Sequence, residues 1–146
     1  MVPPSAEDLR FKTRSDGYVH VHPSSTIAKN PSIVSDSPYY VFNEKIKTSR
    51  VFVRDLTMVP IYPMILFGGG DQVEVELQRG QFVVSLEGGW IKVVTATQSI
   101  AEFLQRMRFE LDQILVDKFA NPKLDLATDP RKKLIIDAIV SVISIE

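Results

Sequence analysis

The sequence contains no cysteine among its 146 residues. Disulfide bonds, cysteine-ligated zinc, iron–sulfur clusters and thiol catalysis are therefore excluded. Long hydrophobic runs are also missing, because the longest apolar run without a charge, Met58 to Phe67, contains two prolines and is too short to span a bilayer. The first nine residues carry acids and prolines where a signal peptide would carry basic residues. We therefore expect an intracellular protein, cytoplasmic or nuclear, with no membrane partner.

Neither sign of charge is in clear excess, because the chain has 17 Lys and Arg and 18 Asp and Glu, which gives a formal net charge of −1. This balance excludes a polybasic tail and a disordered acidic segment. The distribution is uneven, however: residues 10–54 hold eight Lys and Arg but three Asp and Glu, a local charge of +5. A folded domain can bind an anionic polymer through one basic face. The same surplus is equally consistent with a solvated surface.

Short strands dominate the pattern from Leu9 to Val94. Runs of alternating apolar and polar residues are separated by clusters of Gly, Pro, Asn and Ser, which predicts five to seven strands. The stretch from Ser24 to Pro38 predicts a long loop, and Tyr62 to Phe67 predicts a brief helix. A small Greek-key barrel of the OB type commonly carries a helix between its third and fourth strands. The pattern therefore favours a mainly β (α+β) fold built on a five-stranded OB-type barrel.

Two helices are predicted after the strands. Apolar residues at helical spacing begin near Ser99, which forms a Ser-x-x-Glu capping box with Glu102. A second helix is predicted to begin at Asp129, followed by Pro130 in its first turn. We expect residues 1–8 to be a flexible tether, residues 9–96 a barrel, and residues 97–146 helices packed on it, in one domain overall. Trp90 is predicted to be a core anchor.

The motifs that indicate catalysis are absent. Gly68–Gly70 is followed by an acidic residue, where a phosphate-binding loop needs Lys and then Ser or Thr. His20 and His22 lack a third histidine or a cysteine for a metal site. Glu74 and Glu76 fit the solvent side of a hairpin better than a pair of glycosidase carboxylates. No catalytic residue, metal or cofactor is therefore predicted for this chain.

The segment from residue 44 to residue 54 is the richest in binding chemistry. Four cations lie within ten residues, interleaved with two hydroxyls: Lys45, Lys47, Thr48, Ser49, Arg50 and Arg54. Cations meet phosphates and hydroxyls position the backbone in a groove that follows a nucleic-acid strand. His22 precedes Ser24 and Ser25, whose hydroxyls can bond phosphate oxygens. The alternative interpretation is a pair of exposed strands with solubilising charges.

These residues resemble a known family. The match is carried by His22-Pro23-Ser24-Ser25, YYVFNEKIKTSRVFVR at residues 39–54, YPMILFGGG at residues 62–70, and Gly89-Trp90-Ile91. In this order and spacing they are similar to the C-terminal OB-fold domain of DEAH/RHA-type, or DExH-box, ATP-dependent RNA helicases. Within that family the resemblance points to the branch that carries ubiquitin-associated and RWD modules upstream. The following helix, with ELDQIL at residues 110–115, fits the same region.

The resemblance implies a non-catalytic domain that closes over the RNA channel and contacts the single strand. It implies that ATP and Mg²⁺ bind to RecA-like domains outside this chain. Carried over by position, the residues expected to bind RNA are His22, Ser24, Ser25, Lys45, Lys47, Thr48, Ser49, Arg50 and Arg54. Thr26 and Ile27 depart from the Val-Asn that usually follows the serines.

Two functions remain open from the sequence. The first is an RNA-binding, regulatory domain of an RNA-stimulated ATPase. The second is a protein-docking module that packs against sister helicase domains (RecA-like, winged-helix and helical-bundle) or a regulatory partner, with little RNA contact of its own. In either case we expect the chain to be monomeric and not an enzyme by itself.

Overall fold

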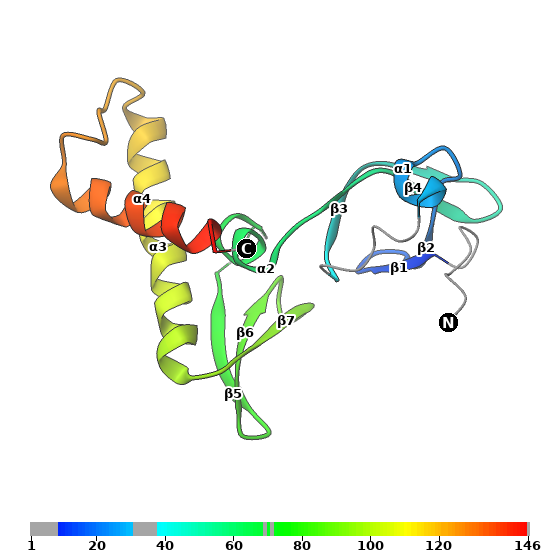
Figure 1. Cartoon of the computed structure of the whole chain (residues 1–146), viewed down its shortest axis with the longest axis horizontal. Helices are drawn as coiled ribbons and strands as arrows, with labels where there is room; N and C mark the ends of the chain where they lie inside the picture. Colours follow the sequence, from blue (N-terminus) through cyan, green and yellow to red (C-terminus); the bar gives the residue numbers. More distant parts are fainter. Residues whose placement is uncertain (1–8, 31–37, 69, 71, 146) are drawn as a thin grey trace. The chain divides into compact units, whose positions relative to one another are not determined.

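The strands of the chain form two separate sheets, as traced in Figure 1. The computed structural model describes residues 9–30, 38–68, 70 and 72–145. Two compact units divide the chain, residues 1–60 and residues 61–146. The predicted tether at residues 1–8 and part of the predicted loop at residues 24–38 lie outside the described residues. Each unit has its own sheet and its own hydrophobic clusters.

The first unit contains a four-stranded sheet and one short helix. Its elements are β1 (Arg10–Thr13), β2 (Gly17–Val21), α1 (Thr26–Lys29), β3 (Tyr40–Lys47) and β4 (Val51–Met58). The sheet order is β1-β2-β4-β3, with antiparallel pairs at both edges and a parallel pair between β2 and β4. The turn between β1 and β2 leads into Gly17, which has a φ of +69°, a conformation that glycine adopts at no steric cost.

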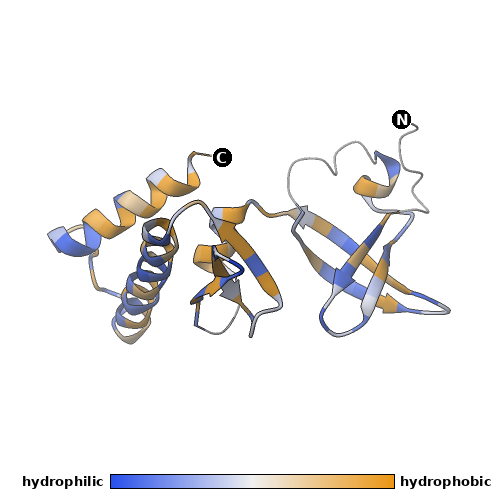
Figure 2. Ribbon diagram, turned by 90° about the horizontal axis from the view of Figure 1, so that it is seen from below, coloured by the Kyte–Doolittle hydropathy of each residue, from blue (hydrophilic) through white to orange (hydrophobic). Residues whose placement is uncertain are grey.

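One face of this sheet packs on α1. The buried residues Leu9, Val21, Ile27 and Ala28 form a cluster, against which Phe11, Tyr40 and Leu56 pack. Along β1 and β2, more exposed and more buried residues alternate. Strands coloured in alternating orange and blue segments are visible in Figure 2. Helix α1 lies within the stretch predicted to be a continuous loop, so that prediction was incomplete.

Asp55 breaks the alternation of β4. In a regular strand Arg54 and Leu56 would lie on the same face. Asp55, however, has a φ of +53°, and the cross-strand pair that it would make with Asn43 is missing from the β3–β4 ladder. As a result Leu56 packs into the cluster, whereas Arg54 bonds to polar groups on the other face. One residue in the left-handed region thus changes which side of the strand faces inward.

The second unit contains a three-stranded antiparallel sheet and three helices. Its elements are α2 (Ile61–Phe67), β5 (Glu74–Gln78), β6 (Gln81–Leu86), β7 (Ile91–Thr95), α3 (Gln98–Ala120) and α4 (Pro130–Ile143). Strands β5 and β6 are joined by a tight two-residue hairpin, in which Arg79 and Gly80 both have positive φ, +51° and +80°, as such a turn requires. Although Leu77 alternates with the acidic residues of β5, it is largely exposed.

Helix α3 covers the three-stranded sheet. Ala101 and Leu104 of α3 are buried with Val84 and Leu86 of β6 and Ile65 of α2. The helix begins two residues earlier than predicted from Ser99, because the Thr97 side chain accepts a hydrogen bond from Ile100 N at 3.3 Å. The predicted capping box is therefore wrong, and Thr97 is the N-cap.

Arg108 of α3 ties that helix to the end of α2. Its Nη1 donates to the carbonyl oxygens of Ile65 (3.3 Å) and Gly68 (2.8 Å), which lie in the last turn of α2 and just beyond it. Its Nε also donates to Asp112 at 3.0 Å. A cation at a helix C-terminus satisfies carbonyls that have no partner within the helix. The Arg108 side chain is only 11% exposed, so this contact lies in a largely dry environment.

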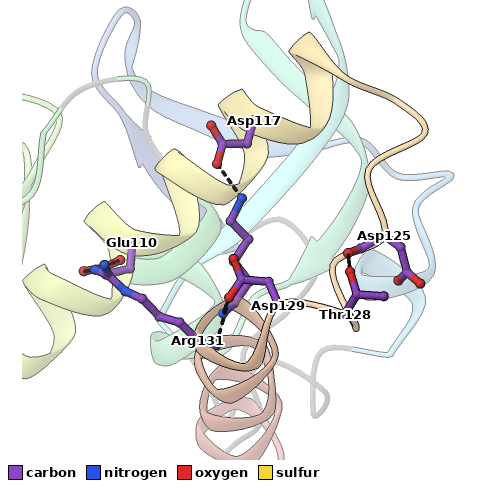
Figure 3. Close-up of polar contacts among 7 residues, drawn as sticks. Glu110, Asp117, Asp125, Thr128, Asp129 and Arg131 are labelled. Atoms are coloured by element: carbon purple, nitrogen blue, oxygen red, sulfur yellow. Dashed lines mark hydrogen bonds and ion pairs between the residues drawn. The ribbon is translucent and has the colours of Figure 1, made fainter.

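Helix α4 packs on α2 and α3 and is fixed at its start by polar contacts. Ile139 is buried with Leu66, Met107 and Leu111. As predicted, Asp129 is the N-cap, and its side chain accepts from the backbone N–H groups of Arg131 and Lys132. Figure 3 shows the two ion pairs that join the helices here, Arg131 with Glu110 at 2.8 Å and Lys132 with Asp117 at 2.6 Å.

The predicted five-stranded barrel is wrong. The described residues form sheets of four and three strands, and neither is a closed barrel. Trp90 is not a core anchor either, since it lies in the turn before β7 and is 38% exposed. Among the described residues, no helix is both long enough and apolar enough to cross a membrane.

Candidate nucleic-acid interface

The turn between β3 and β4 presents two cations and two hydroxyls. Thr48 N donates to Arg50 O at 2.9 Å, and the Thr48 hydroxyl contacts the same oxygen at 3.4 Å, so the turn is held by its own backbone. The side chains of Lys47, Ser49 and Arg50 are exposed and make no hydrogen bond or ion pair within the part of the chain that the structure describes. They are therefore available to an anionic ligand.

Lys45 is already paired. Its Nζ lies 2.7 Å from Asp16 Oδ2, which belongs to the turn between β1 and β2. The hydrogen bond from Lys45, followed by one from Ser15, lowers the pKa of Asp16 below its ordinary value of 3.8. Because the pair is partly exposed, it contributes little to stability. Lys45 would have to leave this carboxylate before it could bind a phosphate.

His22, Ser24 and Arg54 form a connected polar group at the end of β2. His22 Nδ1 lies 2.8 Å from the Ser24 hydroxyl, which accepts from Arg54 Nη2 at 3.2 Å. Arg54 Nη1 contacts Glu44 Oε2 at 3.3 Å across the β3–β4 ladder. The His22 backbone N–H donates to Val53 O at 3.0 Å, which extends the pairing of β2 with β4. Arg54 therefore acts here first as an organiser of neighbouring side chains.

The hydrogen bonds around His22 determine which ring nitrogen carries the proton. The Ser24 backbone N–H donates to Nδ1 at 3.2 Å, so Nδ1 is an acceptor in the neutral ring. The proton is then on Nε2, which has no partner within the described residues. Phe52 packs edge-on against the ring, with centroids 5.9 Å apart and planes at 77°. His22 thus presents a single fixed N–H donor.

Ser25 occupies a different position from its neighbour. Its backbone N–H donates to His22 O at 2.9 Å, and its hydroxyl oxygen is buried with no hydrogen-bond partner among the described residues. Ser25 lines a cavity of about 110 Å³ together with Ser24, Thr26, Ile27, Asp55 and Leu56. The resemblance gave Ser24 and Ser25 the same role, but in the structure Ser24 contacts the polar group and Ser25 the cavity wall.

The predicted residues fall into two groups that do not share a face. In the ladder Lys45 pairs with Val53 and Lys47 with Val51, so both lysines lie on the side of the buried Val53. Arg54 lies on the opposite side. Four residues of β4, about 13 Å at 3.3 Å per residue, separate Arg50 in the turn from Arg54. A strand of nucleic acid could contact both groups only by passing over the edge of the hairpin.

Three contributors were missed by the sequence analysis. Asp16 neutralises Lys45, Glu44 holds Arg54, and Phe52 packs on His22. The pairing of Glu44 with Arg54 could have been found from the sequence, because both lie at matching distances from the predicted turn. Asp16 and Phe52 depend on which strands are neighbours, which the residue pattern does not determine. Within residues 9–30, 38–68, 70 and 72–145, no group of three His, Asp or Glu is placed to hold a metal ion.

Two family models match this chain. The first, an oligonucleotide/oligosaccharide-binding (OB) fold, matches residues 2–70. The second, a C-terminal domain in RNA helicases, matches residues 83–144. The first match therefore covers all of β1–β4 and helix α2, and the second begins in β6 and includes α3 and α4.

Several RNA helicases are similar to the chain. A Homo sapiens protein named Putative ATP-dependent RNA helicase DHX57 is 57% identical over 109 residues, which are 75% of this chain and 8% of that protein. DExH-box ATP-dependent RNA helicase DExH1 of Arabidopsis thaliana is 32% identical over 91% of this chain and 12% of its own length. ATP-dependent RNA helicase DHX29 of Homo sapiens is 31% identical over 86% of this chain and 8% of its own length.

The chain spans about a tenth of the length of these relatives. The relatives are all RNA helicases, and the second family model is a C-terminal domain in RNA helicases. The chain belongs to the DExH-box RNA helicases, in which it corresponds to the OB-fold and the C-terminal domain.

Proposed function

We propose that this chain is a non-catalytic RNA-contacting part of an ATP-dependent RNA helicase, and that it holds single-stranded RNA at the helicase channel. In this proposal ATP and Mg²⁺ bind to RecA-like domains elsewhere in the parent protein. The chain supplies cations, hydroxyls and one imidazole donor, and it performs no chemical step. The parent works inside the cell, in the cytoplasm or the nucleus.

The observation that carries the proposal is the turn between β3 and β4. Lys47 and Arg50 flank Thr48 and Ser49, and neither cation makes a side-chain hydrogen bond or ion pair among the described residues. A fixed turn with two unpaired cations can bind successive phosphates without reading the bases. RNA binding through this turn is therefore expected to tolerate many sequences and to weaken with salt.

A double variant tests the turn. In Lys47→Ala/Arg50→Ala, we expect weaker binding to a fluorescent single-stranded RNA, measured by anisotropy at several salt concentrations. Each lost phosphate contact should reduce the slope of log affinity against log salt by about 0.7. The matched control is Arg106→Ala/Lys123→Ala, which removes the same charges from exposed positions in the second unit. Normal RNA binding with an unchanged slope in Lys47→Ala/Arg50→Ala would contradict the proposal.

ATP provides a second test. We expect the chain neither to bind nor to hydrolyse ATP, because the glycines at residues 68–70 are not followed by the Lys and Ser or Thr of a phosphate-binding loop. In the parent protein, Lys47→Ala/Arg50→Ala should reduce RNA stimulation of the ATPase and leave basal hydrolysis largely intact. RNA-stimulated phosphate release by the chain alone would contradict this assignment.

A protein-docking function is the second candidate, and exposed apolar side chains of the second unit favour it. Phe119 of α3 is 80% exposed and Leu134 of α4 is 70% exposed. Large apolar side chains gathered on a surface are typical of protein contacts. In Phe119→Ser/Leu134→Ser, docking predicts weaker binding to the rest of the parent protein supplied as a separate chain, with RNA binding unchanged. Loss of RNA binding in this variant would contradict the docking function.

A further inference from the structure

The face of the four-stranded sheet that points away from α1 carries a set of residues that neither family model assigns. Cross-strand pairs place Arg10 opposite His20 and Lys12 opposite Tyr18. His20 in turn lies beside Phe52 of β4. Alternation along β2 puts His22 on the same side. Three adjacent strands thus bring cations and rings to one surface.

The rings on this face are in contact with one another or with a cation. His20 and Phe52 have centroids 5.9 Å apart, and Phe52 lies at the same distance from His22. The Arg10 guanidinium lies 5.9 Å from the centroid of Tyr18. Tyr18 is 67% exposed, so its ring is not used to fill a core. Tyr18 and His20 lie about 7 Å apart along β2, because two strand residues rise about 3.3 Å each.

The charge of this face favours a polyanion. Arg10, Lys12 and Arg54 contribute three cations, and the carboxylate of Glu44 lies on the same side, paired with Arg54. Aromatic rings alone would equally suit an apolar protein segment. Rings interleaved with cations at a sheet surface suit single-stranded nucleic acid, whose bases stack while its phosphates pair with the cations.

We propose that this outward face, centred on Tyr18, His20 and Phe52, is a stacking platform for the bases of a single strand of RNA. The proposal rests on the proposed function and adds a second, base-dependent contact to the phosphate contacts of the β3–β4 turn. Every base has a π-face, so the platform is tolerant of sequence. It does, however, require bases, and this distinguishes it from a purely electrostatic surface.

Tyr18→Ala tests the platform with two probes. The first is single-stranded oligoadenylate RNA of about 12 nucleotides, and the second is an abasic sugar–phosphate strand of the same length. We expect Tyr18→Ala to weaken binding of oligoadenylate by about 5- to 100-fold, the effect of losing one stacked base. Binding of the abasic strand and the salt slope should stay unchanged, because no cation is removed. Tyr18→Phe should restore binding of oligoadenylate.

The control and the remaining outcomes separate this proposal from the previous one. Phe109→Ala removes a similarly exposed ring, 61% exposed on α3, and should leave both probes unaffected. Thermal melting verifies that Tyr18→Ala is folded. If the unmodified chain binds neither probe at low salt, both proposals are wrong. The stacking platform is wrong if the unmodified chain binds both probes equally and Tyr18→Ala has no effect on either. It is also wrong if Tyr18→Ala weakens the binding of both probes to the same extent. In both cases the proposal that the β3–β4 turn binds phosphates is retained.

Discussion

His22 shows how a single side chain is prepared for binding before any ligand arrives. Its Nδ1 receives the Ser24 backbone N–H, its ring packs edge-on against Phe52, and its own backbone N–H is bonded to β4. A donor held in this way loses little conformational freedom when it binds. The contacts that fix it come from the residues just after β2 and from strand β4, so the site depends on the folded first unit.

The proton position on His22 can be measured directly. We expect the neutral ring to carry its proton on Nε2, because Nδ1 accepts from Ser24 N. The ¹⁵N chemical shifts of the two ring nitrogens report this at a pH where the ring is neutral. His20 serves as the comparison in the same spectrum, because its ring has no hydrogen-bond partner among the described residues. A protonated Nδ1 on neutral His22 would contradict the assignment.

Asp16 makes the folding stability of the first unit depend on pH. Lys45 and Ser15 lower its pKa below 3.8, so the charged carboxylate favours the folded state. That contribution is present above the unfolded pKa and is lost as the pH falls through the folded pKa. In Asp16→Asn we expect part of the acid-induced drop in melting temperature between about pH 6 and pH 2 to disappear. Asp137→Asn, which removes an exposed ion pair of the second unit, is the control.

Strand β4 contains one residue with irregular backbone geometry, Asp55. Asp55 adopts a φ of +53°, which costs a branched side chain about 1–2 kcal/mol relative to glycine. We therefore expect the free energy of unfolding of Asp55→Val to lie about 1–2 kcal/mol below that of Asp55→Gly, measured by urea denaturation. Asp55→Gly should keep or raise it, because glycine adopts this conformation freely. Equal stabilities of the two variants would contradict the role assigned to the irregularity.

The junction between α2 and α3 depends on Arg108. Removing the guanidinium in Arg108→Met leaves the carbonyls of Ile65 and Gly68 without this donor. We expect the free energy of unfolding to fall by about 1.5–3 kcal/mol, the range for hydrogen bonds to a charged group. Arg106→Met, at an exposed position on the same helix, should change it by less than about 0.5 kcal/mol. If Arg108→Met and Arg106→Met lowered the free energy of unfolding by similar amounts, the role assigned to Arg108 would be wrong.

Local signals predicted the elements well. Asp129 and Pro130 place the start of α4 correctly, because an N-cap and its following proline act within one turn. The predicted start of α3 was wrong by two residues, since Thr97 and Ser99 are both competent caps and only the backbone path decides between them. Trp90 was misassigned because its position in a turn overrides its hydrophobicity.

Pairing between distant strands could not be predicted from the sequence. The closed barrel was an inference from the number of strands and one helix, but barrel closure depends on contacts far apart in the chain. The same limit applies to the site. The basic turn between β3 and β4 was found because it is continuous in sequence, whereas the partner of Lys45 comes from the β1–β2 turn, 29 residues away.

At the scale of the whole molecule the charge is divided between the units. Residues 1–60 hold eight Lys and Arg and six Asp and Glu, whereas residues 61–146 hold nine and twelve. The chain is therefore slightly anionic at pH 7, although residues 1–60 carry a net charge of +2 and residues 61–146 a net charge of −3. We expect retention on immobilised heparin despite the net charge of −1, and elution at lower salt for Lys47→Ala/Arg50→Ala. Equal elution of Arg106→Ala/Lys123→Ala and Lys47→Ala/Arg50→Ala would contradict this division.

The two faces of the four-stranded sheet share no residue. The cluster on α1 uses Leu9, Phe11, Val21, Tyr40 and Leu56, while the outward face presents Arg10, Lys12, Tyr18 and His20. Substitutions on the outward face therefore need not disturb the cluster. Evolution could retune what this sheet recognises in small steps, each one nearly neutral for folding. The same separation makes the sheet a convenient scaffold on which new binding preferences could be selected in the laboratory.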